Sequence, residues 1–137
     1  MSDNVINISD FFSKDNEENG IWYEVKVRGV NSGIEFKIYG PNSTAAAVAQ
    51  DGYNKAKDEI NKIEDVTAKS KALDKALAEY AAALCCDIRS KDPEKKLTNK
   101  DGSEVTKADI KDILFNAPVL ASDIARFETN QNNFLSN

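Results

Sequence analysis

The residues best suited to covalent chemistry are two adjacent thiols, Cys85 and Cys86. A reactive thiol normally needs a neighbouring base or a positive environment, and the chain contains no histidine, so no Cys–His pair can form within one subunit. The surrounding pattern predicts a helix, on which neighbours point about 100° apart, and this geometry is poor for a disulfide. We therefore expect a buried Cys85 and a half-buried Cys86 with structural roles.

A second candidate is a calcium loop in the segment LTNKDGSEVTKA. Asn99, Asp101 and Gly102 would occupy the third, fifth and sixth places of an EF-hand loop. The first and twelfth places hold Leu97 and Ala108, whose side chains cannot bind a hard cation. The segment is better explained as a glycine-containing turn, and we predict neither a metal site nor a cofactor.

Acidic residues are numerous, but they lie among lysines in polar phases of the pattern. The closest pairs are Asp58 and Glu59, Glu64 and Asp65, and Asp109 and Asp112. A general acid needs a desolvated setting that shifts its pKa, and solvated faces explain these residues better. The sequence also contains no glycine-rich phosphate loop, no Cys/His metal spacing and no Gly-x-Ser-x-Gly elbow. We therefore do not expect an enzyme.

An aromatic platform for single-stranded nucleic acid is a further possibility that the charge disfavours. The platform and its basic neighbours would be Trp22, Tyr23, Phe36, Tyr39, Lys26, Arg28 and Lys37. Glu24 and Glu35 interrupt this set, and the net charge of −5 opposes binding to phosphates or to anionic lipid. No apolar run suits a signal peptide or a membrane span. These features predict no nucleic acid, no membrane and a cytoplasmic location.

The elements that must position these residues indicate an α+β fold. Residues 1–20 are polar and predict a loose N-terminal segment, with Ile6, Ile8, Phe11 and Phe12 holding one turn to the body. Residues 21–137 are predicted to form a single domain, because a chain of 137 residues has the usual size of one domain. Strict alternation of apolar and polar residues over 21–40 predicts a small antiparallel hairpin, with a loop at 29–33.

A mainly helical body of about four helices follows the hairpin. The expected spans are 43–64, 66–88, 106–116 and 118–135. Asn42 or Ser43 and then Asp65 or Thr67 can cap the first two, and Thr106 with Asp109 resembles a capping box. Pro118 suits the first position of the last helix. The polar connection over 89–104 is long for a compact domain, and such loops are often functional or mobile.

The order of these parts, together with the segments LTNKDGSEVTKADIKDIL and NAPVLASDIARFETNQNNFLSN, resembles the tail assembly chaperones of long-tailed bacteriophages and prophages. The resembling positions are Leu97, Thr98, Asp101, Gly102, Ile110, Leu114, Pro118, Leu120, Ile124, Phe127, Asn133, Phe134 and Leu135. The N-terminal half fits only in outline.

The resemblance implies a non-enzymatic chaperone in the host cytoplasm that is missing from the mature virion. Such proteins cover the helical tape measure protein, keep it soluble and help to recruit tail tube protein, and helix-in-groove packing suits that task. We expect the partner to bind an apolar face of the last helix beside the exposed side of the hairpin. The residues of that face are Trp22, Leu120, Ile124, Phe127, Phe134 and Leu135. The same residues also fit a core, and a homo-oligomer is compatible with the sequence.

Family members often make a longer product by ribosomal frameshifting, and Asn133-Phe134-Leu135 can be encoded by a slippery heptamer. Other codons serve equally well, so the gene sequence must decide this point. Two other functions remain open. One is a small connector or tail protein of the virion, and the other is an unrelated cytoplasmic protein-binding module.

Overall fold

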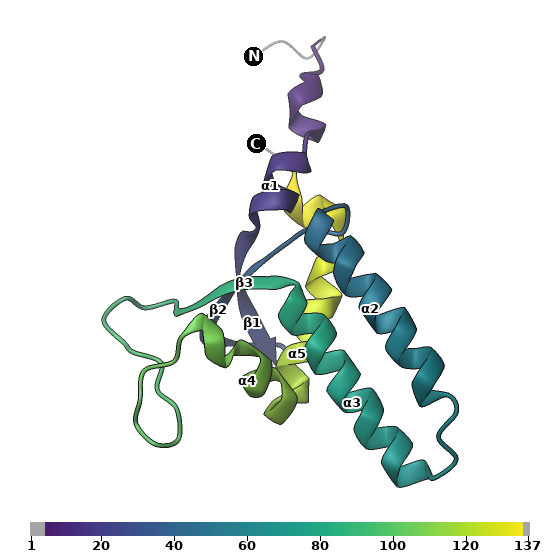
Figure 1. Ribbon diagram of the computed structural model, residues 1–137. Helices are drawn as coiled ribbons and strands as arrows, with labels where there is room; N and C mark the ends of the chain where they lie inside the picture. The colour runs from purple at the N-terminus through teal and green to yellow at the C-terminus, as the bar shows by residue number, and fades with distance from the viewer. Residues whose placement is uncertain (1–4, 136–137) are drawn as a thin grey trace.

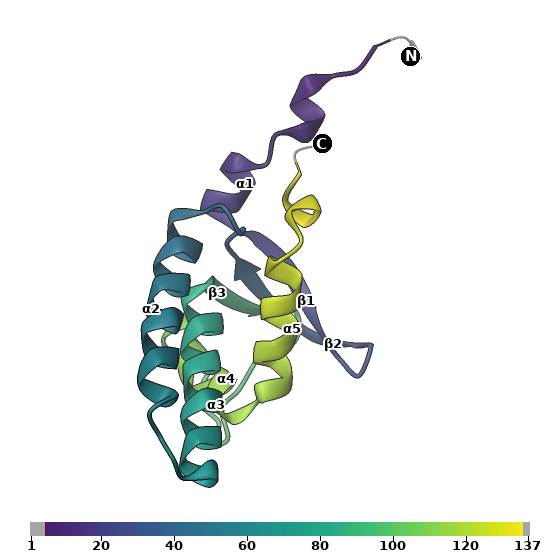
Figure 2. The same ribbon diagram turned by 90° about the vertical axis from the view of Figure 1, so that its right-hand side faces the viewer.

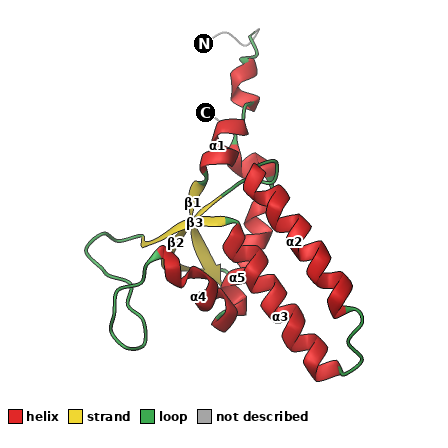
Figure 3. Cartoon of the chain, viewed as in Figure 1, coloured by secondary structure: helices red, strands yellow, loops and turns green. Residues whose placement is uncertain are grey.

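The computed structural model describes residues 5–135, and within that range it has an α+β fold, as the sequence predicts (Figures 1 and 3). The helices are α1 (Lys14–Asn19), α2 (Thr44–Ile60), α3 (Val66–Ala83), α4 (Ile110–Asn116) and α5 (Pro118–Glu128). The strands are β1 (Ile21–Val27), β2 (Val30–Ile38) and β3 (Cys85–Ser90). Short 3₁₀ turns are η1 (Ile8–Phe11), η2 (Lys107–Asp109) and η3 (Gln131–Phe134).

The predicted hairpin is present, but its turn is tighter than expected. β1 and β2 pair antiparallel and are joined by Arg28 and Gly29, whose φ angles are 53° and 77°. Two positive φ angles define a turn that matches the right-handed twist of the strands. Val30 to Gly33, predicted as loop, therefore belong to β2.

The helix predicted for 66–88 ends at Ala83, and the chain continues as a third strand. β3 pairs antiparallel with β2 in the sheet order β1-β2-β3, and Ile88 lies opposite Phe36. This pairing satisfies backbone groups along β2 that would otherwise form a free edge. Ile88 is buried in the core. The helical pattern also predicts its burial, so an apolar residue at this position does not distinguish a strand from a helix.

The last helix is also shorter than predicted. α5 begins at Pro118 and ends at Glu128, and η3 follows it. Asn130 caps η3 by accepting a hydrogen bond from the Asn132 N–H at 3.0 Å. Phe134 nevertheless reaches the core, where it is fully buried. The turn η3 directs the Phe134 side chain into the core, and a continuation of α5 is not needed for this.

The predicted starts of α2, α3 and α5 are confirmed. The Ser43 side chain accepts from the Ala46 N–H at 3.0 Å at the start of α2. Asp65 accepts from the Ala68 N–H at 3.2 Å at the start of α3. The expected helix 106–116 divides into η2 and α4, and the Thr106 N–H donates to the Asp109 carboxylate at 2.8 Å.

The N-terminal segment is more ordered than the predicted loose residues 1–20. α1 packs beside η3, and the Asn16 amide donates to the Phe134 carbonyl at 2.9 Å. Residues 5–12, here called the arm, project from this end of the molecule and contain no buried residue (Figures 1 and 2). Residues 1–4 and 136–137, which belong to the predicted loose segment and domain, lie outside the described range.

One core joins the sheet to the helices. Its largest fully buried apolar side chains are Phe36, Ile38, Leu84, Leu114, Ile124 and Phe134. α3 is central, since it packs against α2, α4 and α5, whereas α2 lies outermost on α3 (Figure 2). The α2–α3 pair therefore leaves a long helical surface facing away from the sheet.

Candidate functional site

Three of the six predicted partner-binding residues lie inside the molecule. Leu120, Ile124 and Phe134 belong to the core and are at most 7% exposed. A partner cannot reach these side chains while the domain keeps this fold. The apolar stripe of α5 therefore faces its own sheet, and the expected binding face along the last helix is not exposed.

The other three predicted residues are half-buried and do not form one face. Phe127 stacks on Tyr23 with ring centroids 4.0 Å apart. Trp22 lies under the Arg89 guanidinium, 3.8 Å from the ring centroid, and Arg89 pairs with Glu35 at 2.8 Å. Leu135 follows η3 near α1. Trp22 remains accessible only beside this cation.

A buried carboxylate, Asp123, ties α5 to the hairpin. It accepts hydrogen bonds from the Tyr23 hydroxyl at 2.7 Å and the Lys26 N–H at 2.8 Å, and it pairs with Arg126. Burial raises the pKa of Tyr23 to about 12, and the hydrogen bond to Asp123 adds to this effect. Burial opposes ionisation of Asp123, but the three donors outweigh it and lower the pKa. The polar groups of this cluster bond to one another, so its role is to hold α5 against the hairpin.

Two further carboxylates are buried near the chain ends. Glu17 accepts from the Ser13 hydroxyl at 2.7 Å and from the Asn42 N–H at 2.8 Å. Glu128 is contacted by the Tyr80 hydroxyl at 3.4 Å, and burial raises the pKa of Glu128. Neither group faces a cavity where a substrate could bind. Their contacts instead fasten α1, α2, α3 and α5 together.

The residues considered first for chemistry have structural surroundings. Cys85 and Cys86 lie on β3, not on a helix, and both are half-buried, so the expected full burial of Cys85 is wrong. Loss of solvent around the Cys85 thiol still raises its pKa above the ordinary value. Asp101 accepts from the Ser103 N–H at 3.0 Å within a small turn. Among the described residues no cluster of three His, Cys, Asp or Glu side chains could hold a metal ion. Over the same range no helix combines the length and apolarity needed to cross a bilayer.

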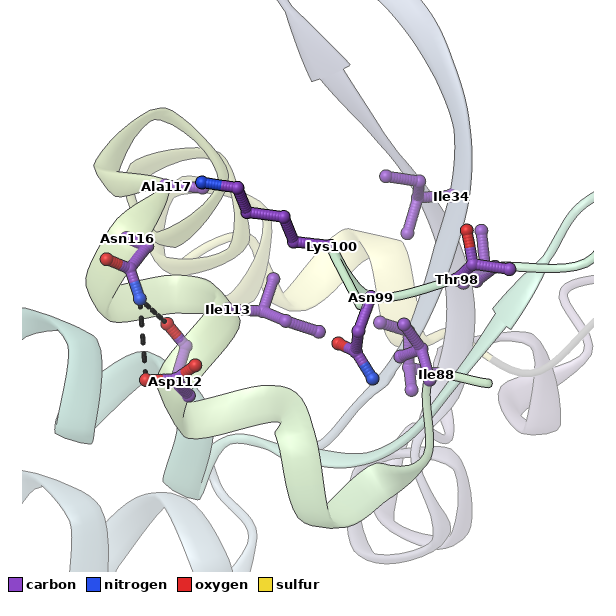
Figure 4. Close-up of a pocket in the computed structure, with 11 residues that line it drawn as sticks. Ile34, Ile88, Thr98, Asn99, Lys100, Asp112, Ile113, Asn116 and Ala117 are labelled. Atoms are coloured by element: carbon purple, nitrogen blue, oxygen red, sulfur yellow. Dashed lines mark hydrogen bonds between the residues drawn. The ribbon is translucent and has the colours of Figure 1, made fainter. Parts of the chain in front are cut away.

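An apolar hollow, here called the sheet groove, lies between the sheet, α4 and the segment 97–105 (Figure 4). Its volume is about 620 Å³. The apolar walls are Ile34, Ile88, Leu97, Val105, Ile113 and Ala117. Lys100 reaches over the mouth toward Ala117, and the Asn116 amide donates to the Asp112 carbonyl at 2.9 Å and its carboxylate at 3.4 Å. The rim thus holds one cation and one carboxylate that is already hydrogen-bonded.

A second surface, here called the helix surface, crosses α2, α3 and α4. Two shallow hollows form it and adjoin at Glu79. Small residues make much of its floor: Ala49, Gly52, Ala56, Ala76, Ala78, Ala83 and Ala108. Val48 is 68% exposed at one end and Phe115 is 47% exposed at the other. Larger side chains complete the lining, and among them Lys111 pairs with Glu79 at 3.7 Å.

The arm is the most apolar exposed segment. Val5, Ile6, Ile8, Phe11 and Phe12 are each at least 58% exposed. The only charged side chain between residues 5 and 12 is Asp10. The sequence prediction that these residues would hold one turn to the body is wrong, because the arm points outward (Figure 2).

Comparison with family models, curated proteins and solved structures found no match to this chain. The sequence pattern predicts neither the sheet groove nor the helix surface, since it assigns their residues to a core, to solvated faces or to the polar connection over 89–104. A usable signal for the arm was its large apolar residues within an otherwise polar segment.

Proposed function

We propose that this protein is a non-enzymatic tail assembly chaperone that binds and solubilises a tape measure protein and helps to recruit tail tube protein. The proposal also places it in the host cytoplasm and outside the mature virion. The resemblance of the C-terminal half supports the family. The helix surface supports the kind of partner, which is an amphipathic helix, and it is the single observation that carries the proposal.

The helix surface suits a helical partner for a steric reason. Small side chains along α2 and α3 allow a third helix to lie close to both, with its apolar stripe inserted between them. Val48 and Phe115 then supply larger contacts at the two ends. Successive copies of this protein could cover a long tape measure protein, with each helix surface shielding one segment of its apolar stripe.

The test is capture of tape measure fragments by the folded full chain. We expect fragments with an amphipathic helical repeat to bind, and Val48→Lys to weaken binding by about tenfold or more, since it buries a charge at the contact. Val66→Lys is the matched control, because Val66 is 80% exposed on α3 and lies outside the helix surface. If no fragment binds, or if both variants lose binding equally, the proposal fails.

A second candidate is a small connector or tail protein of the virion. The exposed arm favours it, because projecting apolar segments can join subunits in an assembly. Mass spectrometry of purified particles separates the two, since a structural part must be present in them at stoichiometric amounts. A chaperone must be missing from the same particles while present in the infected cell.

A further inference from the structure

We infer that the arm of one copy binds in the sheet groove of a second copy. The arm displays apolar side chains that the described residues 5–135 leave largely uncovered. Burying a large apolar side chain is worth roughly 1.5–3 kcal/mol, so an uncovered set of this size indicates a binding segment. The sheet groove offers the complementary feature, an apolar hollow with a polar rim.

The base of the arm is fixed, so its direction is set by the fold. Ser13 is buried, donates to Glu17 at 2.7 Å and accepts from the Gln131 amide at 3.2 Å. From this anchor the arm leaves the molecule beside α1, at the end opposite α4 (Figures 1 and 2). The sheet groove lies against α4. The arm therefore points away from its own groove, so the groove of a second copy is the one that it can enter.

Size and charge agree with this occupant. A hollow of about 620 Å³ lies within the roughly 300–1,000 Å³ range of pockets that bury a small-molecule ligand, so it has room for at least one aromatic side chain. Lys100 is the only cation that lines it, and Asp10 is the only charged residue of the arm. Asn116 already engages Asp112, the acidic residue of the lining. Phe11 or Phe12 in the hollow would bring Asp10 to the rim beside Lys100.

The test compares self-association of matched variants by sedimentation velocity over a wide concentration range. We expect the wild-type chain to associate and Phe11→Ser with Phe12→Ser to weaken association by about tenfold or more. Both side chains are exposed, so folding is preserved, and circular dichroism confirms it. Val66→Ser removes an equally exposed apolar side chain elsewhere and should leave association unchanged.

Charge reversal tests the other side of the contact. Lys100→Asp should weaken association, Lys71→Asp on the exposed face of α3 should not, and Asp10→Lys combined with Lys100→Asp should restore it. An equimolar mixture of the arm variant and Lys100→Asp should form dimers, because one intact arm then meets one intact groove. A wild-type chain that stays monomeric, an arm variant that associates normally, or a mixture that stays monomeric would each overturn the inference.

This inference does not rest on the proposed function. A chain that self-associates through the arm without binding any tape measure fragment would support the inference and count against the chaperone. A chain that binds tape measure fragments but does not self-associate through the arm would support the chaperone and contradict the inference.

Discussion

Glu17 occupies the space next to Gly40 in which any other residue would place its Cβ. A Cβ built at Gly40 would overlap the Cβ and Cγ of Glu17. The Glu17 carboxylate meanwhile accepts from the backbone N–H of Asn42, two residues further on. The packing of α1 against the turn between β2 and α2 therefore requires that residue 40 has no side chain.

Gly40→Ala should destabilise the domain by about 1–3 kcal/mol, because Glu17 would have to leave its buried hydrogen bonds. Urea denaturation, followed by tryptophan fluorescence, measures the change. Gly52→Ala is the matched control, since a Cβ at that position in α2 meets nothing within 4 Å. It should stabilise the protein by up to about 1 kcal/mol. Equal destabilisation by both variants would contradict the role of Glu17.

Tyr23→Phe should lower the free energy of unfolding by about 1 kcal/mol at neutral pH, since it removes the hydrogen bond to Asp123 and keeps the stacking on Phe127. The pH dependence gives a sharper test. The folded state raises the pKa of Tyr23 from 10.0 to about 12, so it binds the proton more tightly than the unfolded chain does. Its contribution is complete below pH 10 and is lost as the pH rises toward 12.

The variant should therefore show a smaller loss of stability than the wild type between pH 10 and 12. Tyr80, whose pKa is also raised to about 12, and Tyr39, whose pKa burial raises as well, remain in both proteins and contribute to the residual loss. Identical slopes for the two proteins would show that Tyr23 titrates as an exposed phenol.

Glu128→Gln should stabilise the protein at pH 7 and change little at pH 4. Burial raises the pKa of Glu128 above its ordinary 4.5, so the folded state favours the protonated carboxyl. Wild-type stability must then fall as the pH rises from 4.5 through the higher folded pKa. Thermal unfolding at both pH values measures the difference, with Glu94→Gln on the exposed 91–96 segment as control. A loss of equal size at both pH values would mean that the Tyr80 contact dominates.

Cys85 should react slowly with iodoacetamide at pH 8, because burial raises the pKa of its thiol and a thiol reacts as the thiolate. Cys86→Ser should therefore give a protein that is labelled slowly until it is unfolded in urea. Mass spectrometry after timed labelling records the rates. Fast labelling of Cys85 in the folded chain would contradict the raised thiol pKa of this half-buried strand residue.

Local signals in the sequence predicted the fold class, the hairpin and the helix starts. Ser43, Asp65 and Pro118 act within one turn, so their effect does not depend on the rest of the chain. The end of α3 was different. Ile88 is in phase with the helix before it. The free edge of β2, where its partner Phe36 lies 52 residues earlier in the chain, decides for a strand. A pattern along one segment does not contain that information.

The candidate surfaces were harder to predict than the fold. Leu120, Ile124 and Phe134 had the pattern of either a core or a binding face, and the sheet against which they pack decides for the core. Phe11 and Phe12, which the sequence analysis places against the body, are exposed instead. An apolar side chain is exposed or buried according to what the tertiary fold places opposite it, which residue type alone does not specify.

The hydrogen bond between Asn16 and the Phe134 carbonyl has a consequence for synthesis on the ribosome. The two partners are 118 positions apart, so the contact between α1 and η3 cannot form until nearly the whole described chain has emerged. The hairpin and the α2–α3 pair form from near neighbours and can fold earlier. α1 can therefore meet the turn before α2 early, through Glu17 and Asn42, whereas the base of the arm gains its contact with η3, between Ser13 and Gln131, only after most of the described chain has been made.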